Sequence, residues 1–416
     1  MVKFSRLLLL GFGFFGINTI WPLYNAYVPI FLKSFGLSSF VVGVYMTIDN
    51  IFALVLSPYV GALSDQTVTR LGKRKPYILI GAPMASVFFL LVPIFWLRHD
   101  FLAITFSIVM MNLSTALFRS PLIALMPDIT PAEYRSQANG IINFMGGLGA
   151  MLAYLAGRFL YEISPTGPFF AGSILLVVSN LLVVLFIKEP LLSKTKGRPS
   201  IAEIFKRSHR ELLENLKELI VSKEKSLFFM LLSIFLWFTG FNALETFFTS
   251  YAKFYLDLPE HIATGMLGVL SLAFMLFSVP AGYIGAKFGR RRSIVLGLST
   301  TAVCLLTGTV LASQIKGEAI VKPFLVLFVI GGTGWALTNV NSLPIVLDMA
   351  PKDKLGGYTG LYYFSSMLAN IVSPPLTGLA MDLLGYRILF VFAASFVIVS
   401  SITVSFVKRG VSAEKV

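Results

Sequence analysis

Residues 40–97 read FVVGVYMTIDNIFALVLSPYVGALSDQTVTRLGKRKPYILIGAPMASVFFLLVPIFWL, two long apolar runs that flank one short charged segment. Each run supplies the roughly 20 apolar residues that a helix needs to cross a bilayer. The charged segment between them, Asp65 to Lys75, is too short to form a domain and suits a loop at the membrane surface. The stretch therefore predicts a hairpin of two membrane-spanning helices.

The composition extends this interpretation to the whole chain of 416 residues. Hydrophobic residues make up 56% and charged residues only 13%, whereas soluble domains average about 45–50% and 25%. The predicted fold class is an all-α membrane protein with twelve transmembrane helices, the third and fourth joined by the tight link Arg98-His99-Asp100. We place the spans near residues 8–32, 40–64, 76–97, 101–126, 138–161, 167–187, 228–252, 263–286, 293–313, 322–346, 357–381 and 387–407.

The charged residues, the single cysteine and the histidines exclude other classes of protein. The net charge is +14, but the basic residues lie in short loops rather than on a face with stacking aromatics, so we expect no nucleic-acid partner. Cys304 alone cannot form a disulfide framework. His99, His209 and His261 are scattered without metal-ligand spacing. We therefore expect neither an enzyme nor a cofactor or metal, and the expected partners are a small-molecule substrate and membrane lipid, with the chain as a monomer.

The positions of Lys and Arg predict the orientation of the chain. Most of the 34 Lys and Arg residues fall in loops on one side of the predicted spans. Positive residues favour cytoplasmic loops, so we place both termini in the cytoplasm. The first apolar stretch lacks a signal-peptide cleavage site and should remain as a span. The expected location is a prokaryotic cell (inner) membrane.

The two halves of the chain resemble each other. The single long polar segment divides them, which predicts six-helix domains at 1–188 and 227–416 and a cytoplasmic linker with an amphipathic helix at 189–226. Because six is even, both copies keep one orientation, which is typical of transporters that bind substrate between two rocking bundles. The matching segments are Gly16-Ile17-Asn18 with Gly240-Phe241-Asn242, Gly72-Lys73-Arg74 with Gly289-Arg290-Arg291, and Asp128-Ile129-Thr130-Pro131 with Asp348-Met349-Ala350-Pro351.

Two motifs resemble a known family. Gly61-Ala62-Leu63-Ser64-Asp65 with Arg70-Leu71-Gly72-Lys73-Arg74-Lys75-Pro76 resembles the signature loop of the major facilitator superfamily. The segment Arg119 to Asp128, with Arg135, is similar to bacterial relatives of the sucrose transporters, in the branch with the glycoside-pentoside-hexuronide symporters. The resemblance implies two pseudo-symmetric six-helix bundles. It also implies a gate that pairs charges at the cytoplasmic face, and the gating residues are Asp65, Arg70, Gly72, Lys73, Arg74, Asp128 and Arg135.

The resemblance also implies a function, the symport of a sugar or glycoside with a proton or sodium ion. Plant sucrose transporters carry Arg where this chain has Ile123, so sucrose itself is not the expected solute. The alternative is an efflux transporter of amphipathic drugs or lipids that works by proton antiport. An efflux transporter needs a largely apolar cavity, whereas a sugar site needs amides, fixed donors and aromatic rings.

Three ionisable residues lie within predicted spans, where a charge costs about 2.5–3.5 kcal/mol. Glu245 is the first candidate ion-coupling carboxylate and Asp49 the second. A structural hydrogen bond is the alternative role for Glu245. Arg119 could hold substrate or tie helix ends together. By helical rise, Asp49 and Arg119 lie on opposite sides of the midplane, so we do not expect them to form a direct ion pair.

Polar and aromatic residues cluster on the first, seventh and tenth spans. Packing or interhelical hydrogen bonding is the alternative role for each one alone. With Arg119, the candidate substrate-binding residues are Asn18, Trp21, Tyr24, Asn25, Asn242, Trp335, Asn339 and Asn341.

Overall fold

The computed structural model describes residues 4–130, 135–189, 224–351 and 354–408, together with residues 210, 217, 219 and 221. These residues form helices and connecting turns, with no strand among them. Twelve helical segments in this part of the chain are long and apolar enough to cross a membrane. The predicted fold class is therefore confirmed. The predicted linker helix lies almost wholly outside the described residues, and the predicted domain boundaries remain a prediction.

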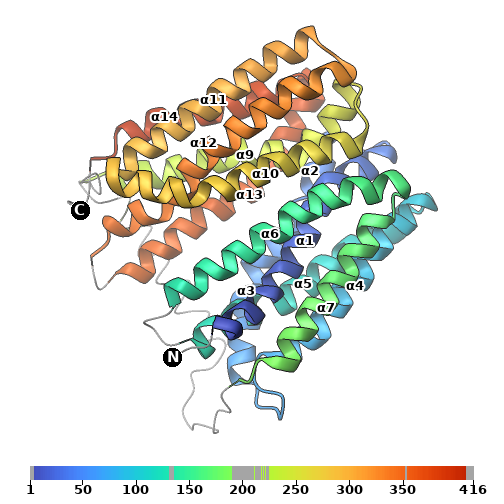
Figure 1. Ribbon diagram of the computed structural model, residues 1–416, viewed down its shortest axis with the longest axis vertical. Coiled ribbons are helices and arrows are strands. Elements are labelled where there is room, and N and C mark those ends of the chain that lie inside the picture. Colours follow the sequence, from blue (N-terminus) through green and yellow to red (C-terminus); the bar gives the residue numbers. More distant parts are fainter. Residues whose placement is uncertain are drawn as a thin grey trace. The chain divides into compact units, whose positions relative to one another are not determined.

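The helices pack into two compact units (Figure 1). Unit 1 is formed by the described residues of 1–35 and 48–206, and unit 2 by those of 36–47 and 207–416. Unit 1 contains α1 (Phe4–Ser34), α3 (Ile48–Gln66), α4 (Lys75–Leu97), α5 (Phe101–Ile129), α6 (Arg135–Ile163) and α7 (Gly167–Phe186). Unit 2 contains α2 (Ser39–Tyr45), α9 (Ser226–Tyr255), α10 (Glu260–Phe288), α11 (Arg290–Gln314), the 3₁₀ turn η2 (Gly317–Ile320), α12 (Val321–Asp348), α13 (Leu355–Leu384) and α14 (Ile388–Ser405).

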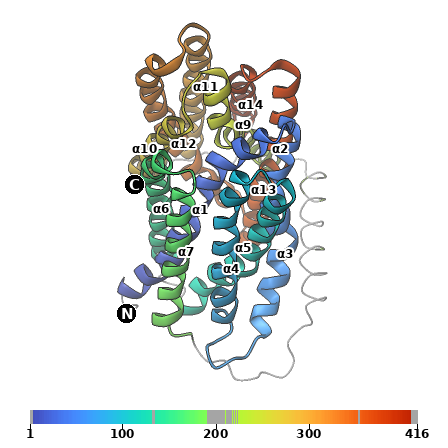
Figure 2. The same ribbon diagram turned by 90° about the vertical axis from the view of Figure 1, so that its right-hand side faces the viewer.

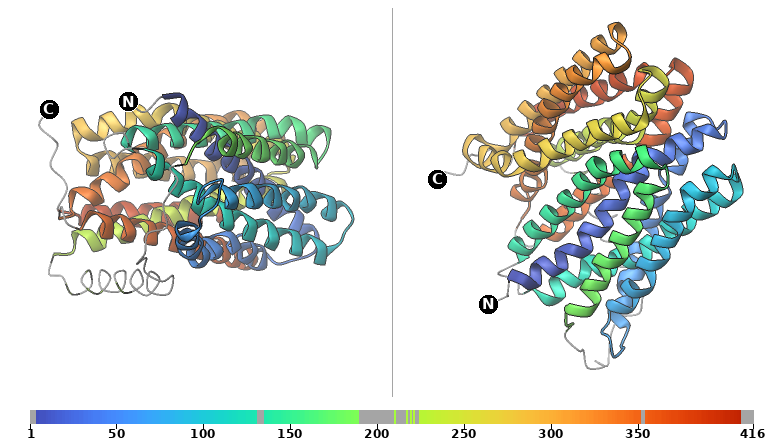
Figure 3. Two further views of the ribbon diagram at one scale, coloured as in Figure 1. Left: turned by 90° about the horizontal axis from the view of Figure 1, so that it is seen from below. Right: turned by 45° about the vertical axis from the view of Figure 1, so that its right-hand side comes forward.

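The two units repeat one packing pattern, which can be followed in Figure 3. In unit 1, α1 packs against α6 and α7, α5 packs against α3 and α4, and α4 packs against α7. In unit 2, α9 packs against α13 and α14, α12 packs against α10 and α11, and α11 packs against α14. The duplicated glycines occupy matching joints. A Cβ at Gly16 would meet Ser179 of α7, and a Cβ at Gly240 would meet Ala393 of α14.

Helices α4, α7, α11 and α14 carry large apolar side chains on their exposed surfaces. Val87 is 55% exposed, Leu185 63%, Val303 62% and Ile402 54%. Water would disfavour such extended apolar surface, and these are the third, sixth, ninth and twelfth spans, whose interiors hold no charge. Their surfaces therefore suit contact with lipid.

The second predicted span is interrupted in a way that the sequence analysis did not anticipate. Residues 40–64 were expected to form one helix, but α2 ends at Tyr45 and α3 begins at Ile48. The short helix α2 belongs to unit 2, where it packs on α13 (Figure 2). The turn at Met46 and Thr47 therefore marks where the chain passes from one unit to the other.

The α2 helix is anchored to α13 by a carboxylate. Both oxygens of Asp382 accept hydrogen bonds from the first backbone amides of α2, Ser39 N and Phe40 N, each over 2.8 Å. These amides have no partner inside the helix, so Asp382 satisfies them. Tyr386, which is hydrogen-bonded to Ser39, completes the joint, and its burial raises the pKa of the phenol to about 12.

The backbones of α2 and α13 approach closely because glycines face each other's helix. A Cβ at Gly43 of α2 would lie 2.3 Å from Pro374 O, and a Cβ at Gly378 of α13 would lie 2.1 Å from Ser39 O. No larger residue fits at either position without moving the backbone. The contact is therefore specific to this pair of glycines.

Candidate functional sites in the two units

A polar cluster lies inside unit 1, where side chains of α1, α3 and α5 meet. Asn112 Nδ2 donates a hydrogen bond to Tyr24 Oη over 3.5 Å, and Asn50 Nδ2 donates to Asp49 Oδ1 over 2.8 Å. Asp49 interacts electrostatically with both Tyr24 and Arg119. The two charged residues expected within the spans of this half are thus brought into one site, although its function remains a prediction.

The expectation that Asp49 and Arg119 stay apart rested on helical rise along one straight second span. The break at Met46 and Thr47 invalidates that count, because Asp49 lies in the first turn of a new helix, α3. A carboxylate is stabilised in the first turn of a helix by the peptide dipoles. Asp49 and Arg119 interact electrostatically, and the expectation that they form no direct ion pair stays a prediction.

Trp21, another of the residues proposed in α1, joins this cluster. Its ring meets Tyr24 edge-on with centroids 5.6 Å apart, and its Nε1 is buried without a hydrogen-bond partner in the described part of the chain. Asn18 instead donates to Phe14 O over 2.8 Å. The amide of Asn18 also faces α6, where a Cβ at Gly146 would lie 2.9 Å from its Nδ2. Asn25 is partly buried.

In unit 2, Glu245 lies in the middle part of α9 and is partly buried. Asn242 lies three residues earlier on the same face of α9 and donates a hydrogen bond from Nδ2 to Asn370 Oδ1 of α13. The aromatic ring of Trp335 stacks on Phe241, with centroids 3.9 Å apart and an interplanar angle of 3°. Of the predicted set, Asn242 thus bonds to α13 and Trp335 packs against α9.

The two remaining asparagines of α12 differ in their surroundings. Asn341 is 3% exposed, and its Nδ2 donates to Ala281 O over 3.1 Å and to Leu337 O over 2.9 Å. A Cβ at Gly285 would collide with this amide, so Asn341 fills the joint between α10 and α12. Asn339 is partly buried. Interhelical hydrogen bonding is therefore what the structure shows for Asn341.

Five of the proposed gating residues lie in and beside the α3–α4 loop, residues 67–74. Arg74 is 4% exposed and its guanidinium donates to Asp128 over 3.0 Å, to Gly61 O over 3.1 Å, and to Asp65 and Ser64. Lys73 Nζ lies 2.9 Å from Asp128. We call these residues, with Gly72 and Glu189, the loop network. Arg70 is exposed and does not join it, and the side chain of Arg135 lies outside the described residues.

Glu189 is the residue of this network that the sequence analysis missed. Its carboxylate accepts hydrogen bonds from the backbone amides of Lys73, Arg74 and Lys75, at distances between 2.7 and 3.3 Å. It therefore caps α4 from the end of α7. The available signal was an acid directly after the sixth span, but the sequence analysis assigned that position to the linker. Asn112 was also missed, although an amide side chain within an apolar span is itself a sign of a functional or structural role.

The described residues contain no group of three or more His, Cys, Asp or Glu side chains placed to hold a metal ion. Paired six-helix units with charged residues inside their apolar helices define a helical membrane protein of the secondary-transporter class. The chain belongs to the Major Facilitator Superfamily, because the model of that family matches residues 7–272 and 256–415. The superfamily expected from the α3–α4 loop is thus confirmed, and the protein is an integral membrane transporter.

Relatives with curated descriptions are drug-resistance transporters. The chain is 25% identical over 256 residues to the quinolone resistance protein NorA of Staphylococcus aureus, a match that covers 61% of this chain and 60% of NorA. It is 25% identical over 404 residues to a multi-drug resistance efflux pump PmrA homolog of Lactococcus lactis, covering 94% of this chain and 91% of that protein. These similarities do not point to the sucrose transporter branch.

Solved structures with the same fold carry varied solutes. The nucleoside transporter NupG superposes with a TM-score of 0.73 at 11% identity over 97% of this chain and 99% of NupG. A D-xylose–proton symporter superposes with a TM-score of 0.68 at 16% identity, over 97% of each chain. At these identities the likeness shows the fold alone. Both neighbours are transporters rather than enzymes.

Proposed function

We propose that the protein is a secondary transporter that exports amphipathic organic compounds in exchange for protons. The observation that carries this proposal is the similarity to the PmrA efflux pump homolog across 94% of the chain. The interior of unit 2 agrees with it, because the rings of Phe241 and Trp335 stack on each other and Glu245 follows Phe241 by one helical turn on α9. An apolar surface with one acid suits an amphipathic solute better than a polyhydroxylated one.

Three of the five amides that led us to expect a sugar are engaged within the protein. Asn18 donates to a backbone carbonyl of α1, Asn242 pairs with Asn370, and Asn341 donates to two backbone carbonyls. A sugar site needs such groups to face the solute, since each hydroxyl loses its water on binding. Sugar or glycoside symport with a proton or sodium ion therefore remains a prediction that no finding favours. Membership of the sucrose transporter branch also remains a prediction.

Coupling follows from competition at a carboxylate. Glu245 can hold a proton or a cationic solute, but not both at once. In the proposed cycle, a proton that enters from outside displaces the solute, and the next solute displaces the proton on the inner side. Asp49 is the second coupling candidate in this proposal. Arg119 interacts electrostatically with Asp49.

The test uses everted membrane vesicles that contain the full chain and a lipophilic cation, tetraphenylphosphonium. A pH gradient, acid inside, should drive uptake of the cation into the vesicles, and a protonophore should abolish that uptake. The Glu245→Gln variant should lose uphill movement but keep downhill exchange. The matched control is Glu260→Gln, because Glu260 lies at the start of α10 and pairs with Lys253. Uphill transport retained by the Glu245→Gln variant would reject the coupling role.

A cation-driven accumulation of a glycoside in right-side-out vesicles would instead favour the sugar prediction. The proposed orientation, with both termini in the cytoplasm of a prokaryotic cell and the protein in its inner membrane, has a separate test. A tag inserted after Ser200 should be inaccessible from outside intact cells.

A further inference from the structure

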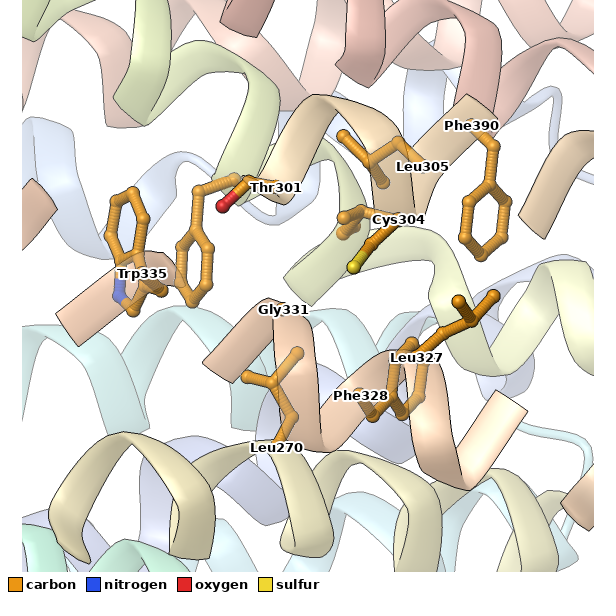
Figure 4. A pocket seen from close by; sticks show the side chains of 11 residues that line it. Leu270, Thr301, Cys304, Leu305, Leu327, Phe328, Gly331, Trp335 and Phe390 are labelled. Atoms are coloured by element: carbon orange, nitrogen blue, oxygen red, sulfur yellow. The ribbon is translucent and has the colours of Figure 1, made fainter. Parts of the chain in front are cut away.

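Helix α11 presents one face to the interior of unit 2 and the opposite face to the exterior. Figure 4 shows Thr301 and Cys304 of α11 facing Gly331 of α12 across a pocket, which fixes the rotation of α11. On the opposite face, exposed side chains recur at alternating intervals of four and three residues, the spacing of one stripe along a helix. The stripe consists of Arg292, Leu296, Ser299, Val303, Leu306 and Val310. A cation therefore stands at one end of a mostly apolar stripe.

Helix α14 packs beside α11 and extends this surface (Figure 1). Its exposed side chains include Ile398, Ile402 and Phe406, which are 38%, 54% and 52% exposed. Arg291 joins the two helices at the same end as Arg292, because its guanidinium donates a hydrogen bond to the carbonyl at the end of α14. The outward sides of α11 and α14 thus form one apolar surface with a basic end, which we call the α11–α14 surface.

The positive charge at the basic end is not balanced by nearby acids. The sequence contains no Asp or Glu from residue 261 to residue 317, a stretch that includes all of α11. Arg290 pairs with Asp348. Arg292, by contrast, is exposed and forms no ion pair with any other residue that the structure describes. Lys408, three residues after the end of α14, is also exposed. The basic end can therefore attract an anion.

The matching end of unit 1 presents no such cation. In the repeat, Arg74 and Lys75 correspond to Arg291 and Arg292. Arg74 and Lys75 are only 4% and 8% exposed, and Arg74 forms an ion pair with Asp128. The same fold thus holds the corresponding residues buried in unit 1. The exposed position of Arg292 is a property of unit 2.

The two parts of an anionic phospholipid match the two parts of the α11–α14 surface. A guanidinium binds phosphate oxygens through two parallel hydrogen bonds, and acyl chains cover apolar helix surface without loss of hydration. A water-soluble phosphate would contact the basic end and leave the apolar side chains uncovered. A zwitterionic lipid would bring a second positive charge close to Arg292. The surface therefore favours a lipid whose headgroup carries net negative charge.

We propose that the α11–α14 surface binds an anionic phospholipid, with its phosphate on Arg291 and Arg292 and its acyl chains along Leu296, Val303 and Ile402. Arg291 can take part because a guanidinium has five N–H donors and its bond to α14 uses few of them. The bound lipid would hold α11 and α14 together from outside. This inference does not depend on the efflux proposal, because it concerns the surface of one unit rather than the path of the solute.

The test compares dioleoyl phosphatidylglycerol with dioleoyl phosphatidylcholine, which has the same acyl chains and no net charge. Binding of each lipid to the purified full chain in detergent is measured by native mass spectrometry. Phosphatidylglycerol should bind at least about fivefold more tightly, and Arg292→Ala should weaken its binding about fivefold, the effect of one basic residue at a membrane surface. Arg292→Lys, which keeps the charge but loses the paired hydrogen bonds, should lose less. The matched control is Arg387→Ala, an exposed arginine at the other end of α14, which should bind as the native chain does.

A further variant separates the acyl chains from the headgroup. Leu296→Asn places an amide in the apolar stripe, so it should weaken binding of both lipids by the same factor and leave the preference for phosphatidylglycerol intact. Arg292→Ala should instead remove most of that preference. Both side chains are exposed, so neither variant disturbs the interior of unit 2.

Equal affinity of the native chain for the two lipids would overturn the proposal, and so would native affinity for phosphatidylglycerol in Arg292→Ala. An equal loss in Arg387→Ala would show attraction to net charge rather than a site. Unchanged binding of both lipids in Leu296→Asn would remove the acyl chains from α11. Binding of sn-glycerol 3-phosphate as tightly as the lipid, and its loss in Arg292→Ala, would assign the basic end to a soluble phosphate instead. The assay contains no gradient and no transported solute, so none of these outcomes bears on efflux.

Discussion

The α3–α4 loop of unit 1 and the α10–α11 loop of unit 2 share a glycine at positive φ but differ in their ion pairs. In unit 1 the glycine of the loop, Gly72, has φ of 115°, and in unit 2 the matching Gly289 has φ of 96°. Both values lie in the region that favours glycine. The repeat thus keeps a glycine at positive φ in two loops of different length, residues 67–74 in unit 1 and Gly289 alone in unit 2.

The charges around that turn differ. In unit 1, Arg74 is buried and binds two aspartates, Asp65 and Asp128. In unit 2 the position of Asp65 is taken by Ala286, and Arg290 keeps one partner, Asp348, over 3.4 Å with side chains 24% and 41% exposed. An exposed pair contributes little to stability. The dense ion pairing is therefore a property of unit 1 in the described part of the chain.

The side chain that joins this loop to the last helix also differs in the sign of its charge between the two units. In unit 1, the carboxylate of Glu189, which follows α7, accepts hydrogen bonds from the backbone amides at the start of α4. In unit 2, the guanidinium of Arg291 donates a hydrogen bond to the carbonyl of Ser405 at the end of α14. Both links satisfy backbone groups left open at a helix end, with the sign of charge that each end favours. One joint has thus been stabilised in two opposite ways.

The largest difference in stability between the two units is expected from removing Arg74 in one and Arg290 in the other. Arg74→Ala leaves two aspartates facing each other without their shared partner and should lower the free energy of unfolding by about 3 kcal/mol. Arg290→Ala should cost less than about 1 kcal/mol. Thermal melting of the two variants in the same detergent measures the difference. Equal losses would mean that the two loops are energetically equivalent.

The second largest difference in stability is expected from removing the carboxylate of Glu189, which caps α4. Glu189→Ala exposes three backbone amides and should cost about 2 kcal/mol. The control is Glu224→Ala in unit 2, where the carboxylate accepts one backbone bond, from Ser226 N over 2.9 Å, with an expected cost of about 1 kcal/mol. Hydrogen exchange at the first turn of α4 should rise in the first variant only. Unchanged exchange there would remove the capping role of Glu189.

A smaller difference is expected at the two glycines. Gly72→Ala and Gly289→Ala both place a Cβ at positive φ, which costs about 1–2 kcal/mol. At Gly72 the new Cβ would also lie 2.5 Å from Glu189 Oε2. We therefore expect a further loss at Gly72 that disappears when Glu189→Ala is the background, as a double-mutant cycle of melting temperatures would show. Additive losses would indicate that the two residues are not coupled.

The smallest effect on stability is expected at Asp65, whose side chain is 52% exposed. Asp65→Asn should cost at most about 1 kcal/mol, yet slow turnover severalfold with little change in solute affinity if the loop network gates transport. The measurement is transport rate against solute concentration in vesicles. A rate equal to that of the native chain would return the loop to the role of orienting the protein.

The number of spans and the repeat were predictable because lipid imposes long apolar runs and because the matching motifs are separated by a nearly constant interval. The charges inside the spans were also predictable, since their cost makes each one conspicuous. Contacts across helices were not, because the pattern along a helix does not reveal its rotation against its neighbours. Asn341 was thus expected to face solute, although its amide joins α10 to α12.

The break in the second span was missed for a different reason. No proline marks it, and the apolar run continues through Met46 and Thr47. Its cause is tertiary, because the anchor for α2 is Asp382, more than 300 residues later in the chain. The sequence of residues 40–64 alone therefore gives no indication of that partner.

The path of α2 has a consequence for chain complementation. A gene divided within the linker would yield an N-terminal fragment that carries α2 without the helix that receives it. The C-terminal fragment would carry Asp382 and Gly378 with nothing docked on them. Each product would lack a piece that only the other supplies, so the two should be degraded when made separately and rescued when made together.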